Sequence, residues 1–331
     1  MGEQVTAAGE KPVASWAGMD RHRNEAMPSL TIILRSGGCR WGRCRMCGYR
    51  SVRYAGLSET DLEQRIIAQL RWVQDQFDLR TFPLIKIYSS GSVFDPAEVP
   101  LGARERIASL FRGKIVVVES RPEFVHEEEV AEFRGQLDDG TYARPLAVAM
   151  GLETADDAVR EKSIDKGFTT EDYRCAAAEA HRAGADVKTY LLQKPLFLTE
   201  QESIDDVVRS INVAASFSEI ISLNPCNVQS GTVLEACWKK GAYRPPYLWS
   251  VIRTLRQSPV HVVCDPVGGG HARGPHNCGD CDKEIVDGIR TYSLTGDTAL
   301  LKDLEERGCA CRKEWEYVLR EERPYCMPLT R

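Results

Sequence analysis

The chain has 331 residues, a formal net charge of −5 and 43% apolar, 27% charged and 8% aromatic residues. This is the composition of a folded globular protein, and it excludes a disordered chain, a collagen-like repeat and a coiled coil. Because the chain is acidic overall, any nucleic acid must be bound by a local basic patch rather than by global charge.

Short β-rich apolar runs alternate with segments of helical periodicity along most of the chain. Strands are predicted at Leu30–Leu34, Leu84–Tyr88, Lys114–Val118, Leu146–Met150, Asp186–Leu192 and Glu219–Leu223, with a seventh at Val260–Val263. Helices are predicted at Ser58–Phe77, Glu98–Phe111, Glu123–Phe133, Thr169–Ala183, from Thr199 onwards and at Tyr247–Gln257. Residue pairs three apart, Thr60 with Glu63 and Thr199 with Glu202, indicate capping boxes at two helix starts.

Strands and helices that alternate in this way predict βαβ units and a parallel sheet. Six or seven units favour a complete or partial TIM-like barrel over a doubly wound sheet. In either fold the chemistry is expected at the carboxyl ends of the strands. The expected organisation is an N-terminal extension over residues 1–29, a barrel over 30–263 and a Cys-rich C-terminal module over 264–331 with three short helices.

The location of the protein follows from what the sequence lacks. No apolar run approaches the roughly 20 residues that cross a bilayer, and the first thirty residues have no signal-peptide core. A cytoplasmic location and no membrane partner are therefore expected. The chain contains 12 cysteines, and because a reducing cytoplasm disfavours disulfides, metal binding is the better explanation where the spacing agrees.

The first group, Cys39, Cys44 and Cys47, forms a C-x4-C-x2-C run directly after the first predicted strand. Three thiolates can hold three irons of a [4Fe–4S] cluster and leave the fourth iron open to a substrate or cofactor. Nearby glycines leave the backbone free to wrap around such a group: Gly37, Gly38, Gly42 and Gly48. The alternative is a structural zinc site completed by a distant residue.

The second group consists of two close pairs, Cys278 with Cys281 and Cys309 with Cys311. Such pairs favour a four-thiolate zinc site, which can organise a module too small to be held together by apolar burial. A second Fe–S cluster is the main alternative, and thiols without metal are a third. Alternative ligands for this site are His276, Cys264 and His271. The isolated cysteines are expected to be packing residues or spectators: Cys175, Cys226, Cys237 and Cys326.

A three-cysteine loop after the first strand of a barrel resembles the radical S-adenosylmethionine (SAM) superfamily, although the commonest spacing there is C-x3-C-x2-C. Three strand ends resemble SAM-binding turns of that superfamily: Ser89-Ser90-Gly91-Ser92, Glu119-Ser120-Arg121-Pro122 and Gly151-Leu152-Glu153-Thr154. The resemblance implies that SAM is bound by Ser89, Ser90, Gly91, Glu119 and Glu153. Carboxylates there can accept hydrogen bonds from the SAM ammonium and ribose hydroxyls.

Longer segments resemble one family, the radical SAM proteins of archaeosine biosynthesis. They cover nearly the whole chain: ILRSGGCRWGRCRMCGY, YLLQKPLFLTE, SLNPCNVQSGT, GAYRPPYLWSV, DPVGGG, RGPHNCGDCD and CACRKEW. The resemblance implies a C–N lyase that converts a lysine adduct of 7-cyano-7-deazaguanine in the D-loop of tRNA, at position fifteen, to archaeosine through a 5′-deoxyadenosyl radical. The implied partners are this tRNA, the lysine transferase that makes the adduct, and an electron donor such as ferredoxin.

The cluster loop also concentrates positive charge, since six arginines and no acidic residue lie between Thr31 and Leu57. We expect Arg40, Arg43 and Arg45 to contact RNA phosphates, with neutralisation of the thiolates as the alternative. Polar residues near the ends of later strands complete the expected site. We expect Lys188 and Asn224 to face the cofactor, and the following residues to face the substrate: Tyr190, Gln193, Asn227 and Gln229. The rival hypothesis is a non-catalytic tRNA-binding or redox module with structural metals.

Overall fold

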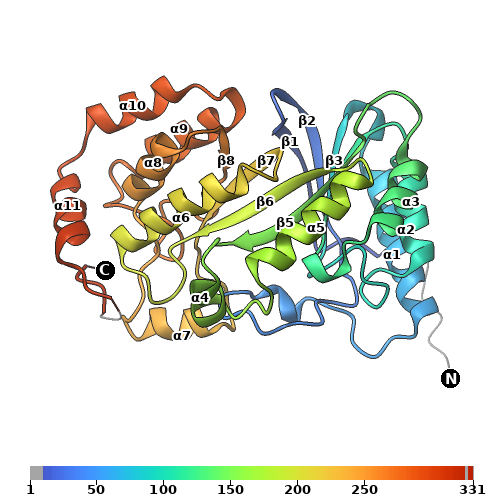
Figure 1. The fold of residues 1–331 in the computed structure, drawn as a ribbon, viewed down its shortest axis with the longest axis horizontal. Coiled ribbons are helices and arrows are strands. Elements are labelled where there is room, and N and C mark those ends of the chain that lie inside the picture. The colour runs from blue at the N-terminus through green and yellow to red at the C-terminus, as the bar shows by residue number, and fades with distance from the viewer. Residues whose placement is uncertain (1–9, 325–326, 331) are drawn as a thin grey trace.

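A computed structural model describes residues 10–324 and 327–330, which form one curled sheet covered by helices on its outer side (Figure 1). The eight strands follow one another in sequence order. They are β1 (Ala14–His22), β2 (Glu25–Ile33), β3 (Leu84–Tyr88), β4 (Ile115–Glu119), β5 (Leu146–Glu153), β6 (Asp186–Gln193), β7 (Ile220–Pro225) and β8 (Val262–Cys264). From β2 to β8 neighbouring strands are parallel. The predicted α/β partial barrel is confirmed, with β1 and β8 as its edges.

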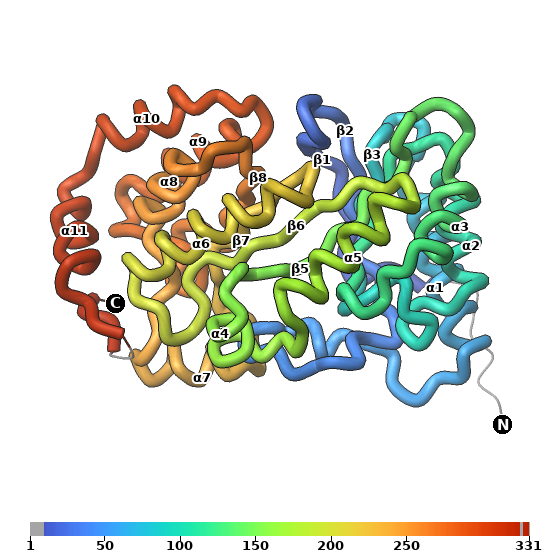
Figure 2. The backbone as a smooth tube through the Cα atoms, viewed as in Figure 1, coloured from blue at the N-terminus to red at the C-terminus, as the bar shows by residue number. Residues whose placement is uncertain are grey.

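Helices connect the parallel strands and extend beyond the last one. The connections contain α1 (Glu59–Gln76), α2 (Leu101–Leu110), α3 (Glu127–Leu137), α4 (Asp157–Val159), a π-helical turn (Arg160–Ile164), α5 (Thr170–Arg182), α6 (Glu200–Ala214), α7 (Val233–Lys239) and α8 (Leu248–Gln257). Short 3-10 turns lie at Tyr49–Ser51, Leu79–Thr81 and Pro122–Phe124. The C-terminal helices are α9 (Asp282–Thr295), α10 (Thr298–Arg307) and α11 (Arg312–Glu321). The chain trace places α10 and α11 at the opposite end of the molecule from α1 to α3 (Figure 2).

Strand β1 was not predicted, because it lies within the segment expected to be an N-terminal extension. It pairs antiparallel with β2 along its whole length. At the tip of this hairpin Arg23 has a φ of 53° and binds Asp186 at the start of β6 through two hydrogen bonds of 2.6 and 2.5 Å. Arg21 donates to the carbonyl of Leu294 in α9 at 2.7 Å. The hairpin therefore ties the first edge of the sheet to its later elements at the amino ends of the strands.

Two helix starts show how far capping patterns predict the structure. The capping box of Thr199 and Glu202 is confirmed at the start of α6. The box of Thr60 and Glu63 was wrong, because α1 begins one residue before Thr60. Its cap is Ser58, whose hydroxyl accepts the backbone N–H of Asp61 at 3.1 Å.

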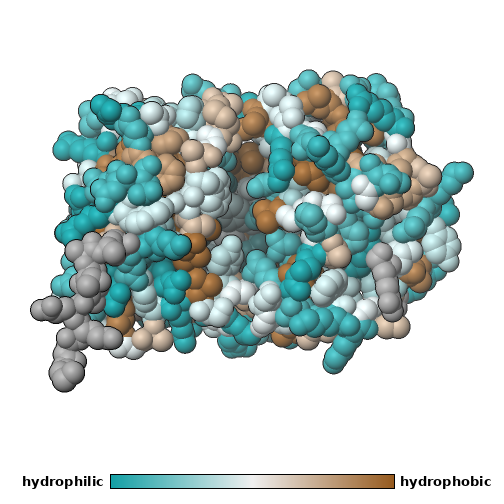
Figure 3. Space-filling view, turned by 180° about the vertical axis from the view of Figure 1, so that it is seen from behind, coloured by the Kyte–Doolittle hydropathy of each residue, from teal (hydrophilic) through white to brown (hydrophobic). Residues whose placement is uncertain are grey.

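The two faces of the sheet differ in chemistry, since side chains of a strand point alternately to opposite sides. The outer face packs against the helices in a large apolar core. The inner face carries a small apolar cluster that includes Leu84, Val117 and Ala149, together with the buried polar residues Lys86 and Lys188. Seen from behind, the molecule is hollowed near the middle of this open side (Figure 3). The inner face of the partial barrel thus combines buried apolar side chains with two buried lysines.

Among the residues that the structure describes, no helix is both long enough and apolar enough to cross a membrane.

Candidate active site and metal centre

The loop that carries Cys39, Cys44 and Cys47 follows β2 and is fixed by segments far away in sequence. The backbone N–H of Arg45 donates to the carbonyl of Ile164 at 2.9 Å, and the Arg45 carbonyl accepts from Leu234 at 3.1 Å. The Gln229 side chain, predicted to face substrate, accepts the N–H of Gly48 at 2.6 Å. Gln229 therefore holds the cysteine loop in place.

The three thiols lie near one another but are not packed around a single point. All three cysteines are partly buried and free of disulfides, and electrostatic interactions connect Cys44 with Cys47 and Cys47 with Cys39. Within residues 10–324 and 327–330, the one group of ligating side chains whose donor atoms all lie within 4.8 Å of one another is elsewhere, at the C-terminus. Three thiols on one loop can bind three different irons of one cluster.

Burial works against ionisation of these thiols, and nearby cations work for it. Burial raises the pKa of Cys44 to about 11, while Lys166 and Arg121 act in the opposite direction. Burial also raises the pKa of Cys47, and Lys166 again opposes it. Since a thiol binds a metal as its thiolate, Lys166 favours the ligating form of both residues. Lys166 was missed at the sequence level because it lies in an irregular loop.

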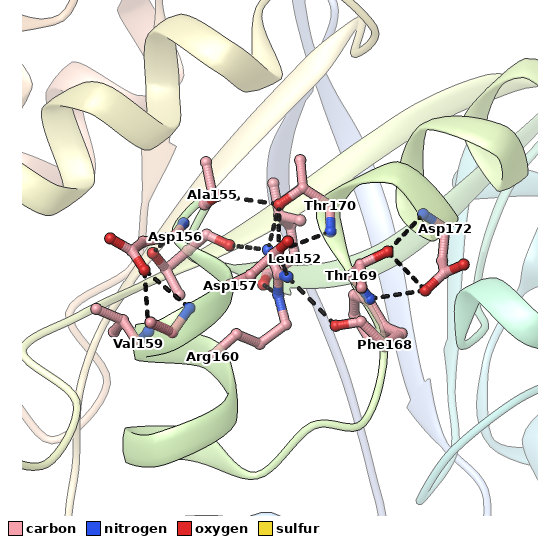
Figure 4. A network of polar contacts seen from close by, with 12 residues as sticks. Leu152, Ala155, Asp156, Asp157, Val159, Arg160, Phe168, Thr169, Thr170 and Asp172 are labelled. Carbon is pink, nitrogen blue, oxygen red and sulfur yellow. Dashed lines mark hydrogen bonds and ion pairs between the residues drawn. The ribbon is translucent and has the colours of Figure 1, made fainter.

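The loop that carries Lys166 is held by a buried arginine (Figure 4). Arg160 donates to the carbonyl of Leu152 at 3.1 Å and to the Thr170 hydroxyl at 2.8 Å, and it also bonds the Thr154 carbonyl. An ion pair with Asp157 completes the network. Arg160 thereby fixes both ends of the connection between β5 and α5, which lies against the cysteine loop.

At the end of β5, Glu153 and Lys166 form an ion pair. A Cβ atom at Gly151 would collide with both side-chain ends, so the glycine makes room for the pair. Glu153 itself has a φ of 66°, a strained conformation for a residue other than glycine that is often found at functional sites. This strand end thus presents a carboxylate and an ammonium beside the thiols.

At the end of β3, the turn of Ser89, Ser90 and Gly91 is supported from below by Glu98. The carboxylate of Glu98 accepts the N–H of Ser92 at 2.7 Å, while its other oxygen is buried without a hydrogen-bond partner. Burial raises the pKa of Glu98 to about 7. The Ser90 hydroxyl donates to the carbonyl of Val52 at 2.6 Å, which connects the turn to the cysteine loop.

Glu119 ends β4 between this turn and the lumen. Burial raises its pKa to about 7, while a backbone hydrogen bond from Ser89 and the charges of Lys188 and Lys166 act to lower it. A carboxylate that loses its proton near neutral pH can accept a hydrogen bond from an ammonium group that binds beside it. Three predicted cofactor residues, Ser89, Glu119 and Glu153, are thus brought to neighbouring strand ends.

The predicted RNA-binding arginines are partly engaged within the protein. Arg40 forms a bidentate ion pair with Asp95. Arg43 is exposed, lies 3.2 Å from Asp165 and stacks over the ring of Trp41. Arg45 has a buried Nε without a hydrogen-bond partner. Of the three, Arg43 is placed best to meet a phosphate.

The remaining predicted residues divide between two faces of the sheet. Tyr190 pairs with Ser222 in the strand register, and Asn224 lies one repeat further along β7 on the same inner face. Gln193 instead donates to Thr254 of α8 at 3.1 Å, on the helix side. Asn227 lies beyond the end of β7, partly exposed, in the segment that leads to Gln229.

The second cysteine group is assembled as predicted. The sulfur atoms of Cys278, Cys281, Cys309 and Cys311 all lie within 4.8 Å of one another. The Sγ atoms of Cys278 and Cys309 are 3.7 Å apart, and those of Cys281 and Cys311 are 3.8 Å apart. Neither His276 nor Cys264 belongs to the group, and Cys326 lies outside the described residues. The four thiols can therefore hold a metal ion without another ligand.

Neighbouring side chains donate hydrogen bonds to these sulfurs. The indole N–H of Trp249 donates to Cys311 at 3.4 Å, and the Asn277 side chain donates to Cys281 at 3.3 Å. Trp249 belongs to α8, so the cysteine group is tied to the helix that precedes β8. Such donors stabilise thiolates and orient them toward a metal.

Comparisons with known proteins place the chain among proteins of similar sequence. No family model matches the chain. The chain is 42% identical over 321 residues to the archaeosine synthase subunit beta of Methanosarcina acetivorans, an alignment that covers 93% of this chain and 90% of that protein. It is 35% identical to the archaeosine synthase subunit beta of Thermococcus kodakarensis, over 92% of this chain and 95% of that protein.

The solved structures that match the chain have much lower identity. A queuine lyase from Clostridium spiroforme bound to SAM and queuine matches with a TM-score of 0.47 and 15% identity, over 67% of this chain and 83% of that one. The Elp3 protein of Methanocaldococcus infernus matches with a TM-score of 0.47 and 14% identity, over 71% and 60% of the two chains. On the strength of its full-length relatives, the chain belongs to the archaeosine synthase subunit beta family.

Proposed function

We propose that this protein is a radical SAM C–N lyase that converts the lysine adduct of 7-cyano-7-deazaguanine in tRNA to archaeosine. The observation that carries the proposal is the position of the three-cysteine loop beside Glu119, Glu153 and Lys166, at the open end of a polar lumen. The family membership supplies the pathway, and the site supplies groups suited to the chemistry.

The residues of the chain have distinct parts in this proposal. Cys39, Cys44 and Cys47 would hold a [4Fe–4S] cluster, and Ser89 to Gly91 with Glu119 and Glu153 would hold SAM. When bound together, the cluster and SAM supply a 5′-deoxyadenosyl radical that can abstract hydrogen from an unactivated carbon. The protein positions the lysine adduct in the lumen and limits the access of water.

The C-terminal cysteines are proposed to bind one zinc ion with a structural role. Four sulfurs about 2.3 Å from a central ion in a tetrahedron lie about 3.8 Å apart, and the measured separations of 3.7 and 3.8 Å match this value. In an Fe–S cluster the thiolates would bind different irons and stand further apart. The geometry therefore favours a single ion over a second cluster.

The proposed partners follow from the reaction and from the relatives. A protein named subunit beta works beside another subunit, and for this chain we propose the lysine transferase that makes the adduct. The tRNA would approach the exposed Arg43, and an electron donor such as ferredoxin would reduce the cluster. All of these steps belong to the cytoplasm.

The test is conversion of an adduct-bearing tRNA in vitro. Anaerobically reconstituted protein with SAM, a reductant and tRNA carrying the lysine adduct should yield archaeosine, detected by mass spectrometry of the nucleosides. A Cys44→Ala variant should leave the adduct intact. Binding of the tRNA by wild-type protein with no archaeosine would instead support the alternative of a non-catalytic tRNA-binding or redox module.

A further inference from the structure

The floor of the lumen consists of Asp20, Lys86 and Lys188 on the inner face of the sheet. Its two lysines are both buried but differ in their ion-pair partners. Lys86 forms an ion pair of 2.6 Å with Asp20 of β1, which also accepts the Ser29 hydroxyl at 2.5 Å. Lys188 is 9% exposed, yet its ammonium has no hydrogen-bond or ion-pair partner in the part of the chain that the structure describes. Its ammonium lies 5.2 Å from the centroid of the Tyr190 ring. The carboxylates of Asp20 and Glu119 act on its charge without forming an ion pair with it, so a ligand carboxylate can supply the direct partner that a buried cation needs.

The register places Lys188 at a definite level of the lumen. Glu119, Ala149 and Lys188 are partners on successive strands, and Tyr190 lies one pleat repeat closer to the carboxyl ends. One such repeat measures about 6.6 Å. Lys188 therefore lies level with Glu119 at the end of β4 and below the ends of β5 and β6.

A second polar atom on the floor is also open. Ser29 and Lys86 both contact the Oδ2 atom of Asp20. Among residues 10–324 and 327–330, the Oδ1 atom of Asp20 therefore accepts no hydrogen bond. The charges of Asp20 and Lys188 affect one another, which places both groups in one electrostatic environment. The floor thus offers an ammonium for an anion and a carboxylate oxygen for a cation.

We propose that this floor binds the α-amino-acid end of the lysine adduct, with the α-carboxylate on Lys188 and the α-ammonium on Asp20. This inference rests on the proposed function, because the adduct joins the base through the lysine side-chain nitrogen and leaves the zwitterionic end free. The α-carboxylate lies about 6 Å from the side-chain carbon next to that nitrogen. With the carboxylate on Lys188, the carbon next to the side-chain nitrogen would lie about one pleat repeat closer to the carboxyl ends of the strands, near Tyr190. Lys188 is then a substrate-positioning residue rather than a cofactor residue.

The experiment measures binding without turnover and uses a small probe. Full-length reconstituted protein with SAM and no reductant is titrated calorimetrically with Nε-acetimidoyl-L-lysine, an amidine with a free amino-acid end. The control ligands are its D enantiomer and acetimidoyl-cadaverine, which lacks the carboxylate. Wild-type protein should bind the L-lysine amidine at least about tenfold more tightly than the cadaverine amidine.

Two variants show whether Lys188 causes this preference. Lys188→Met should bind both amidines equally and keep the cadaverine affinity of the wild type, which also shows that it folds. Lys188→Arg should restore part of the preference. Equal binding of the two amidines by wild-type protein, a preference that survives in Lys188→Met, or no measurable binding of the L-lysine amidine would overturn the proposal.

These outcomes are separable from failure of the proposed function. Wild-type protein that makes archaeosine from the adduct but shows no preference for the carboxylate disproves the amino-acid site alone. Protein that binds the L-lysine amidine through Lys188 but makes no archaeosine retains the site and disproves the lyase.

Discussion

The carboxylate of Glu98 occupies the space that a Cβ atom at Gly91 would need. The same carboxylate accepts the N–H of Ser92, so the turn at the end of β3 is closed over a buried acid. Since Ser89, Ser90 and Gly91 are the proposed binding turn for the methionine end of SAM, this relationship connects a single glycine to cofactor binding.

Gly91→Ala should therefore weaken SAM binding and destabilise the fold. The added methyl group must displace Glu98, and overpacking of this kind costs about 1–3 kcal/mol. Thermal unfolding and equilibrium dialysis with SAM measure the two effects. The matched control is Gly135→Ala in α3, where an added Cβ meets no atom within 4 Å and stability should be unchanged or slightly raised. Equal behaviour of the two variants would contradict this account of Gly91.

Glu98 should also make stability depend on pH. Burial raises its pKa to about 7 from the usual 4.5 of a glutamate, so between these values the folded protein keeps a proton that the unfolded chain has lost. The stabilisation from Glu98 is complete below about pH 4.5 and is lost as the pH rises through about 7, by roughly 3 kcal/mol in all. Glu98→Gln should make the fall in denaturant-unfolding curves from pH 5 to 8 smaller by the part due to Glu98, while the part due to Glu119, whose pKa burial also raises to about 7, remains. An identical slope in wild type and variant would show that Glu98 ionises normally.

The C-terminal thiols should hold zinc independently of the iron centre. Metal analysis of the wild-type protein should find about one zinc and four irons per chain. Cys309→Ser should lose the zinc, keep the irons and unfold about 5 °C lower or more, because metal binding contributes to folding. Cys175→Ser, at an exposed position in α5, is the control and should keep both metals. About eight irons and no zinc would replace the zinc site with a second cluster.

Binding of the amino-acid end should weaken at alkaline pH. Burial and the charge of Lys86 lower the pKa of Lys188 to about 8, and only the protonated ammonium attracts a carboxylate. Affinity for the L-lysine amidine should fall as the pH rises through about 8 and above, since the ligand itself raises the pKa of Lys188. Calorimetry from pH 7 to 9.5 measures this, and in Lys188→Met the affinity should fall less steeply, by only the loss of charge on the ligand's own α-ammonium. Profiles of equal slope in the wild type and in Lys188→Met would mean that Lys188 does not contact the ligand.

The strands and the cysteine groups were predictable from the sequence for physical reasons. Runs such as Leu84–Tyr88, which matches β3 at both ends, are buried on both faces and so are almost continuously apolar. Close cysteine pairs reveal a metal site because the ligands of one ion are often supplied by a single turn.

Other parts depend on contacts that no local pattern encodes. Strand β1 has the mixed sequence ASWAGMDRH, because it pairs along only one edge and all its side chains except that of His22 are exposed or half-buried. Glu98, Lys166 and Asp20 gain their roles from tertiary neighbours at distant positions in the chain. Gln229 and Gln193 were predicted by residue type, but the structure directs one to the cysteine loop and the other to α8.

The most direct measurement is the yield of 5′-deoxyadenosine in a single turnover. Anaerobically reconstituted protein with one equivalent of SAM and excess dithionite should release 5′-deoxyadenosine and methionine, whereas Cys44→Ala should release neither. Wild-type protein that holds four irons and binds SAM but yields no 5′-deoxyadenosine would contradict the assignment of a catalytic iron site to Cys39, Cys44 and Cys47.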